Sequence, residues 1–407
     1  MSCPYHRLSA AFLIMCCTHL ASTSWIAGFQ AQNPASPSPC KGPSRSPASS
    51  AIDSPVPQRA HLFPFQDDRD LWGYMNEAGK TAIEPQFEFA GEFGHEALAP
   101  VRMGGAWAFI DASGGRVFSL PYSANRIEMV RPFRDERAWF SVDGLYGCLD
   151  TKGNVVVSPY YSDAMDFSEG LACVNLGGTI EADAPGIVGG VWNYIGKDGR
   201  TIVRAGARTA YSFSSGLAFV GLEKGYVDSA GHFRITIPGL ERRYGISIES
   251  ANSYSEGLAQ IGVRTKNGTL HGYMDVRGRF VIRPRFTRAT AFSENWAAVE
   301  YNDKWGFIDT TGSTVHPFVF DDAAAIVSGL AWVQVQNEWR IFRRDTRKLH
   351  RPSLEPNDVM DFDRGVARMH VGGTRVNPIG GIDYWRGGAW HYVSPFGRVL
   401  KQYAKDE

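Results

Sequence analysis

WGFIDTTGSTVHPFVFDDA, residues 305–323, decides the fold, because close copies of this stretch recur along the chain of 407 residues. Its opening run of aromatic, Gly, aromatic, apolar and Asp is typical of a short, half-buried strand. Asp309 and Gly312 then have the spacing of a tight turn, in which Asp accepts backbone N–H groups and Gly adopts a positive φ. The β-branched run that follows indicates a second strand, which Pro317 is expected to end. The stretch predicts a β-hairpin.

Nine copies of this hairpin start along the chain, most of them 32 to 47 residues apart. Seven are clear, and two are degenerate, with Arg340 and His391 in place of the Gly after Trp. Repetition favours structural roles, since catalysis needs a residue once whereas packing needs it in every copy. The residues expected to pack or turn in this way are Trp72, Gly73, Trp107, Asp111, Gly114, Gly147, Asp150, Gly153, Gly225, Asp228, Gly272, Asp275, Trp305, Gly306, Asp309 and Gly312.

A second motif, Phe-Ser-Glu-Gly-Leu-Ala-x-Val, follows the hairpin and is clearest at residues 167–174. Its Ser-Glu-Gly is expected to turn and its Leu-Ala-x-Val to form a third strand. A few residues separate this strand from the next copy, so the two should pair as a hairpin. Three short strands per unit and no helical periodicity predict an all-β repeat array. A propeller-like toroid is favoured over an open β-solenoid.

The pattern resembles that of the WG-repeat (KWG-repeat) proteins of bacteria, a family named for the Trp-Gly pair. The resemblance covers roughly residues 62–400 and is strongest from 72 to 335. Members of that family are mostly uncharacterised and occur in varied contexts. The resemblance therefore implies a repeat fold and leaves the activity open.

The N-terminal residues 1–24 indicate export. A basic start is followed by an apolar run and small polar residues, which is typical of a secretory signal peptide. Acylation at Cys16 or Cys17, as in a lipoprotein, is the weaker alternative, because Met15 stands where a small residue is expected. We expect a periplasmic, cell-surface or extracellular protein.

The remaining chain divides by composition. Residues 25–60 are rich in Pro and Ser and predict a disordered linker, since such a segment has little apolar surface to bury. The repeat domain is expected at 61–400, followed by a tail at 401–407.

Outside the N-terminal segment no apolar run is long enough to span a bilayer. Lys and Arg together number 42, as do Asp and Glu, so the net charge gives no reason to expect a nucleic-acid partner.

Motifs for metal or cofactor chemistry are missing from the sequence. The chain has no HExxH, no Walker sequence and no Rossmann glycine fingerprint, so no metal and no cofactor is expected. The Asp-x-x-Gly turns mostly offer one carboxylate each, too few for calcium. Cys148 and Cys173 either pair as a disulfide or lie buried as thiols on strands.

Departures from the repeat are the candidate binding sites. Three insertions, at 175–190, 262–270 and 372–389, fall at the same point of the unit and should emerge on one face. The third contains the richest cluster, and the basic segment 339–351 is a second candidate. Their residues are Asp383, Tyr384, Trp385 and Arg386, and Arg343, Arg344 and Arg347.

The sequence thus predicts an exported, non-enzymatic binding or scaffolding module for a protein or a cell-envelope glycan. One alternative is a glycan-active enzyme, which would need two carboxylates facing each other across a cleft. Another is a protein that binds anionic surfaces through residues 340–351.

Overall fold

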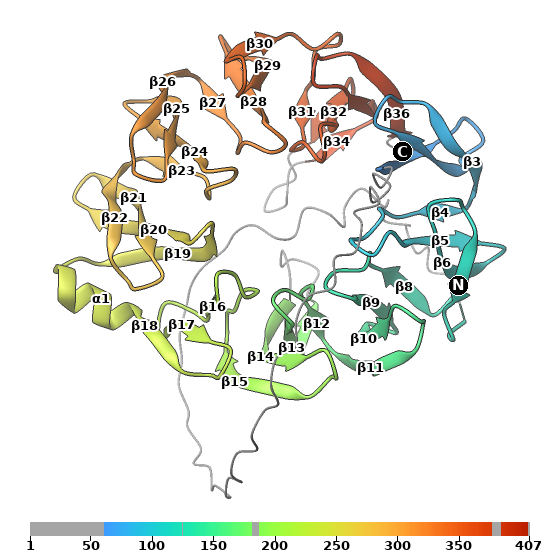
Figure 1. Cartoon of the computed structure of the whole chain (residues 1–407), viewed down its shortest axis with the longest axis horizontal. Helices are drawn as coiled ribbons and strands as arrows, with labels where there is room; N and C mark the ends of the chain where they lie inside the picture. The colour runs from blue at the N-terminus through green and yellow to red at the C-terminus, as the bar shows by residue number, and fades with distance from the viewer. Residues whose placement is uncertain (1–60, 124, 181–186, 377–383, 406–407) are drawn as a thin grey trace, which may run out of the picture.

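A computed structural model describes residues 61–405 except 124, 181–186 and 377–383. Nine small antiparallel sheets follow one another around a ring, so the chain is an all-β propeller (Figure 1). The predicted fold class is confirmed, and the toroid is confirmed over the solenoid. The predicted signal peptide and linker lie outside the described residues.

Each sheet forms one blade, numbered in chain order. Blades 1–3 comprise β1 (Leu62–Gln66), β2 (Trp72–Asn76), β3 (Thr81–Phe87); β4 (Phe89–Ala90), β5 (Ala99–Met103), β6 (Ala106–Ile110), β7 (Arg116–Ser119); and β8 (Ile127–Val130), β9 (Arg137–Val142), β10 (Leu145–Asp150), β11 (Val155–Tyr161). Blades 4–6 comprise β12 (Asp163–Ala164), β13 (Leu171–Ile180), β14 (Ile187–Gly196), β15 (Thr201–Ala207); β16 (Leu217–Phe219), β17 (Gly225–Asp228), β18 (Phe233–Thr236); and β19 (Ile248–Ser255), β20 (Leu258–Thr265), β21 (Gly268–Asp275), β22 (Phe280–Phe286).

Blades 7–9 complete the ring. They comprise β23 (Arg288–Ala289), β24 (Trp296–Tyr301), β25 (Lys304–Asp309), β26 (Thr314–Phe320); β27 (Asp322–Ala323), β28 (Leu330–Val335), β29 (Glu338–Arg343), β30 (Lys348–His350); and β31 (Asp358–Val359), β32 (Ala367–Val371), β35 (Ala389–Val393), β36 (Val399–Lys405). A separate hairpin, β33 (Thr374–Val376) with β34 (Tyr384–Arg386), projects from blade 9.

Seven blades have four strands rather than the predicted three. The additional strand is innermost in the blade and in five of these blades is only two residues long, as in β12 and β27. A strand of two residues shows no alternation, so the sequence pattern could not reveal it. The predicted pairing of Leu-Ala-x-Val with the next Trp-Gly strand is confirmed, for example between β13 and β14.

The Asp-x-x-Gly turns form as predicted. The Asp309 carboxylate accepts the backbone N–H groups of Thr311 at 2.9 Å and Ser313 at 3.0 Å, and Gly312 has a φ of +86°. Asp111 accepts from Ser113 and Gly115 in the same way. Each turn joins the third strand of its blade to the outer one.

The Gly of the Trp-Gly pair allows the outer strand to approach closely. A Cβ on Gly73 would lie 2.6 Å from the carbonyl oxygen of Ile83. Pro85 lies in β3 at this point, beside a bulge between the pairs Trp72–Phe87 and Tyr74–Ile83. The prediction that Pro ends the strand is therefore wrong for β3, as it is for β11, β22 and β26. Pro lacks an N–H but is tolerated at a bulge in an edge strand.

The core lies between neighbouring blades, and buried tyrosines cross from one blade to the next. The hydroxyl groups of Tyr74, Tyr194 and Tyr273 donate to backbone carbonyls of the following blade at 2.7–2.8 Å. Burial raises the pKa of each phenol. These hydroxyls therefore stay protonated as donors at neutral pH.

The Ser-Glu-Gly turns form an inner belt of hydrogen bonds. In each of six consecutive pairs of blades, a side-chain oxygen of one turn accepts a backbone N–H of the next turn. The pairs are Glu96–Glu136, Asp135–Gly170, Glu169–Gly216, Ser215–Gly257, Glu256–Asn295 and Glu294–Gly329, at 2.6–3.3 Å. The acceptor is an acidic residue in five of these pairs and the Ser215 hydroxyl in the other, so this position of the motif connects blades 2 to 8.

Different contacts close the ring between blades 9 and 1. The Lys401 ammonium donates to the Thr81 hydroxyl at 2.8 Å and lies 3.7 Å from the centre of the Phe65 ring. Trp72 packs edge-on against Tyr403, with ring centroids 5.4 Å apart. Strand β36 thereby packs against the first blade.

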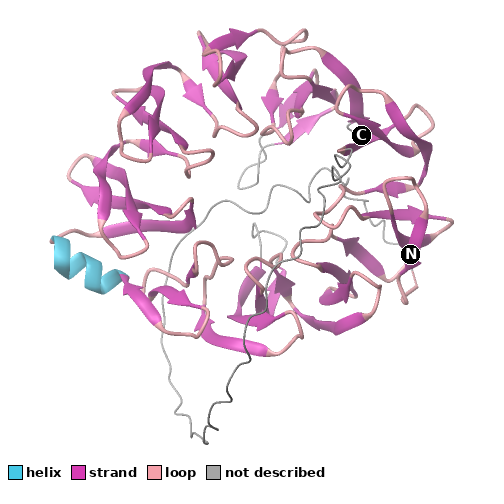
Figure 2. Ribbon diagram, in the orientation of Figure 1, coloured by secondary structure: helices cyan, strands magenta, loops and turns pink. Residues whose placement is uncertain are grey.

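One helix, α1 (Ile237–Tyr244), was not predicted. It lies on the outside of the ring, between β18 and β19 (Figure 2). Thr236 caps its N-terminus by accepting the N–H of Gly239, and Gly245 ends it in the left-handed conformation. Buried Ile237 and Leu240 attach it to the core. These capping residues are a local signal for a helix that stands outside the repeat pattern.

Candidate binding surface

The ring presents two faces with different turns. Strands alternate in direction within a blade, so successive connections alternate between the faces. The Ser-Glu-Gly and Asp-x-x-Gly turns share one face. The connections between second and third strands share the other, which we call the hairpin face. The three insertions all lie at that connection, in blades 4, 6 and 9.

The insertion of blade 4 lengthens β13 and β14 into a hairpin that exposes apolar side chains. Leu176, Val188 and Val191 are 37%, 38% and 41% exposed. Asn175 at its base is fully buried, accepting the N–H of Gly178 and donating to a carbonyl of β14. The buried amide fixes the base of the hairpin, so these apolar groups lie on an ordered surface.

The insertion of blade 6 is polar. Glu249 accepts hydrogen bonds from Arg264 and Thr269 across the β19–β20–β21 sheet. The His271 ring lies 3.1 Å from the amide of Gln260, and burial lowers the pKa of His271. The polar side chains of this insertion are thus hydrogen-bonded to one another.

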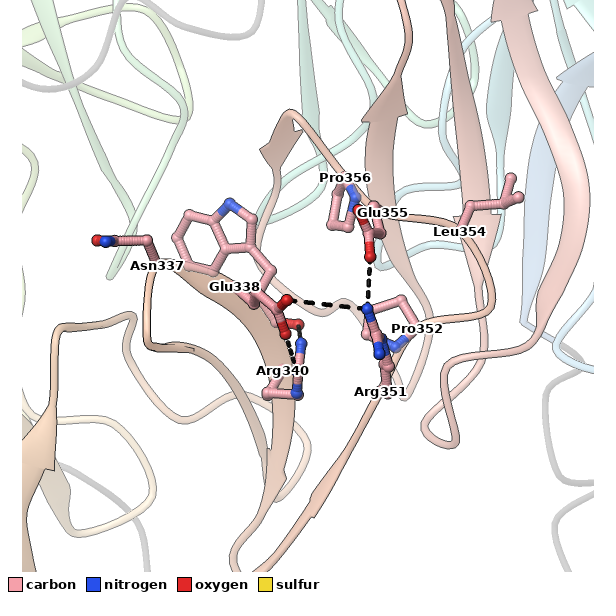
Figure 3. A pocket seen from close by; sticks show the side chains of 9 residues that line it. Asn337, Glu338, Arg340, Arg351, Pro352, Leu354, Glu355 and Pro356 are labelled. Carbon is pink, nitrogen blue, oxygen red and sulfur yellow. Dashed lines mark hydrogen bonds and ion pairs between the residues drawn. The ribbon is translucent and has the colours of Figure 1, made fainter.

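A shallow pocket of about 90 Å³ opens between blades 8 and 9, on the hairpin face (Figure 3). Trp339 forms one side of it and is half-buried, whereas the matching Trp72 and Trp305 are buried. Glu338 pairs with Arg340 and, at 3.9 Å, with Arg351, which also binds Glu355. A half-exposed indole beside two carboxylates and two guanidinium groups can take up a ligand that is apolar on one side and polar at its edges.

The acidic groups of this pocket are paired with its arginines. Arg340 and Arg351 hold the pKa of Glu338 below its usual range, so its carboxylate is ionised and accepts hydrogen bonds. A glycosidase acid needs a raised pKa instead. Among the described residues, burial raises the carboxyl pKa of Asp163 and Asp361, but these belong to blades 4 and 9 and do not form a pair.

The predicted cluster at 383–386 is described in part. Asp383 lies outside the described residues, and the structure describes no side-chain surroundings for Tyr384 and Trp385. The backbone of these two residues forms β34 with the exposed Arg386, paired to β33. This hairpin and the pocket lie on the same face in neighbouring blades.

The basic segment 339–351 is not one surface. It crosses blade 8, with Arg340 and Arg351 in the pocket and the three predicted residues at the opposite turn. Arg343 pairs with Asp345 at 2.7 Å, and Arg344 pairs with Glu294 at 3.3 Å. Arg347 is exposed in that turn. The structure does not bring these side chains together with the 384–386 hairpin.

Sequence reasoning missed the pocket acids Glu338 and Glu355. The available signal was the replacement of Gly by Arg340 after Trp339, which removes the close packing of the Trp-Gly pair.

Over residues 61–405, apart from the gaps named above, no cluster of three or more His, Cys, Asp or Glu could hold a metal ion. Cys148 and Cys173 are free, buried thiols, so the disulfide alternative is wrong.

A family model for the WG containing repeat matches residues 72–107, 146–179, 272–305 and 305–339. No curated protein matches significantly. A crystal structure of a eukaryotic initiation factor is similar in fold, with a TM-score of 0.51 and 12% identity over 86% of this chain and 98% of that one.

The extracellular domain of a putative one component system, BT4673 from B. thetaiotaomicron, is also similar. Its TM-score is 0.30, with 11% identity over 75% of this chain and 44% of that one. Such a distant likeness supports no conclusion about role. Within the part of the chain that the structure describes, no helix is long and apolar enough to cross a membrane.

Proposed function

The chain belongs to the WG-repeat proteins and folds as a β-propeller, and on this basis we propose that it is an exported, non-enzymatic binding module. Its ligand is a cell-envelope glycan or a protein, held on the hairpin face at blades 8 and 9. The observation that carries this proposal is the pocket at Trp339. In this pocket the Trp of the repeat is half-buried, whereas Trp72 and Trp305 are buried, and ionised groups surround its indole.

The shape of the pocket favours a glycan chain. A sugar ring has an apolar face, which can stack on the half-exposed indole, and edge hydroxyls, which can reach Glu338 and Arg351. A volume of about 90 Å³ is well below the roughly 300 Å³ or more of pockets that enclose small molecules. The site therefore suits one unit of a longer chain that continues across the surface.

The alternative of a glycan-active enzyme has less support. The pKa of the pocket carboxylate Glu338 is lowered, and the two carboxyl groups whose pKa burial raises, Asp163 and Asp361, do not line the pocket. Exposed apolar groups at Leu176 and Val191 instead extend the contact surface of the same face. Export is supported by residues 1–24, and finding a processed N-terminus on the mature protein would test it.

Co-sedimentation with purified cell-wall glycan tests the ligand. Trp339→Ala should reduce retention by at least tenfold, since an aromatic anchor at the centre of a site contributes about 2 kcal/mol. Tyr160→Ala is the matched control, because Tyr160 is 59% exposed but lies on the outer strand β11 of blade 3.

Deletion of 377–383 tests the neighbouring hairpin in the same assay. Equal retention of wild type and Trp339→Ala would exclude the pocket as the glycan site. If neither the wild type nor any variant binds glycan but Trp339→Ala weakens a cross-link to one envelope protein, the ligand is a protein.

A further inference from the structure

The outer wall of blades 4–6 carries an excess of positive charge. Between residues 198 and 285 the chain has 13 Lys and Arg residues and seven Asp and Glu residues, whereas the whole chain has 42 of each. Part of this excess lies on the outer strands β15, β18 and β22 and on α1, which follow one another around the ring (Figure 1). Exposed arginines on these elements are Arg204, Arg234, Arg242, Arg243, Arg283 and Arg285, and Arg277 is exposed in the turn before β22.

These arginines are weakly paired with acidic groups. Within the described residues no ion pair involves Arg204, Arg242 or Arg283, and Arg234 reaches Asp228 only at 3.9 Å. This differs from residues 339–351, where Arg343 and Arg344 are paired. Surface charges of one sign that lack such pairs produce a local field that attracts a polyanion.

Exposed apolar side chains lie among the arginines. Ile202 is 50% exposed, Phe233 46% and Val281 45%, and the first and last alternate with Arg204 and Arg283 along their strands. Tyr244, 38% exposed, ends α1 and donates to the carbonyl of Gly278 in blade 6. Basic and apolar groups mixed on one ordered surface are typical of proteins that lie on anionic membranes.

The local fold explains only part of this pattern. Basic residues in the last turn of a helix are favoured by the helix dipole, which accounts for Arg242 and Arg243 in α1. The dipole does not account for Arg204 or Arg283, which lie on strands in the two flanking blades. Contacts across the blades hold the surface together, since Arg243 and Tyr244 of α1 both donate to the carbonyl of Gly278 in blade 6.

We propose that the outer wall of blades 4–6 docks on an anionic lipid bilayer. The arginines lie among the headgroups, and Ile202, Phe233 and Val281 reach the boundary of the acyl chains. The ring would then stand with its edge on the membrane, and the hairpin face would remain open to a ligand.

Vesicle co-sedimentation of the purified full chain tests this docking. The vesicles contain phosphatidylcholine with phosphatidylglycerol, and vesicles of phosphatidylcholine alone are the neutral reference. The triple variant Arg204→Gln/Arg242→Gln/Arg283→Gln should bind anionic vesicles on the order of 100-fold more weakly, roughly fivefold per arginine. Raising NaCl from about 50 mM to about 500 mM should release the wild type.

A matched control removes three charges elsewhere. Lys80→Gln/Arg116→Gln/Lys152→Gln changes exposed residues of blades 1–3 and should bind like wild type. Equal loss in both triple variants would overturn the proposal, because binding would then follow net charge alone. Binding to the neutral vesicles would overturn it as well.

A soluble polyanion is the competing ligand. Ile202→Ser/Phe233→Ser/Val281→Ser should weaken binding to vesicles and leave binding to single-stranded DNA unchanged. If this variant binds vesicles like wild type, and DNA binds as tightly as vesicles, the wall is a general polyanion site and the lipid proposal is wrong. Circular dichroism and the melting temperature confirm that each variant is folded.

Discussion

Replacing Gly272 with Ala adds one methyl group where the third and outer strands of blade 6 approach most closely. The new Cβ would lie 2.5 Å from the carbonyl oxygen of Ile282, 2.6 Å from the nitrogen of Pro284 and 2.9 Å from the carbonyl carbon of Arg283. All three are backbone atoms of β22, so no side chain can rotate away. The strand has to shift as a whole, against the cores on both sides.

We expect this substitution to lower the free energy of unfolding by about 2–3 kcal/mol, the upper part of the range for overpacked positions. Urea unfolding followed by tryptophan fluorescence measures it. Ala108 provides the control, because blade 2 already has Ala at this position and pairs it directly with Ser119. Ala108→Gly should lower stability by only about 0.5–1 kcal/mol, through chain flexibility. If Gly272→Ala is as stable as wild type, the close approach does not explain the Trp-Gly pair.

Three other outcomes follow from buried or hydrogen-bonded groups. Tyr273→Phe leaves the Thr290 carbonyl without its donor and should lower the free energy of unfolding by about 1–2 kcal/mol. The loss should be equal at pH 6 and pH 9, since burial keeps the pKa of Tyr273 far above both. A difference between the losses at the two pH values would contradict this. The Thr311 hydroxyl and backbone N–H groups lower the pKa of Asp309. Its ionised form therefore stabilises the fold above the unfolded-state pKa, and this stability is lost as the pH falls through the folded-state pKa. Asp309→Asn should lose less stability than wild type between pH 5 and pH 2, and parallel curves of stability against pH for the two proteins would refute this. Burial raises the pKa of Cys148 to about 12, so a thiol reagent at pH 8 should label Cys148 only after denaturation, and rapid labelling of the native protein would be incompatible with the fold.

The sequence was sufficient for the repeat, the Asp-x-x-Gly hairpins and the toroid, because each depends on local residues that recur in register. Five of the seven additional inner strands were out of reach, since two residues such as Asp322–Ala323 carry no periodicity. The role of the acid in Ser-Glu-Gly was equally hidden: Glu294 binds the N–H of Gly329 in the next blade, and no spacing within one unit reveals a contact between units.

The candidate pocket was only half visible from the sequence. The loss of Gly at Arg340 marked the eighth copy as unusual, but Glu355 comes from the crossover into blade 9 and joins the site only when that crossover packs beside β29. The basic wall was hidden for a similar reason. Its arginines come from three blades, and the neutral total charge of the chain conceals them.

The inner belt and the contacts of Lys401 are two different kinds of joint between neighbouring blades. Blades 2 to 8 are linked by one repeated bond between chain neighbours, so each link can form as soon as the next blade exists. The joint between blades 9 and 1 brings together residues that are 320 positions apart and forms only when the chain is complete. A ring made in this way has a seam. Under force, in a truncated chain or during synthesis, the molecule should pass through an open arc of joined blades, and new termini made by circular permutation would move the seam to another blade.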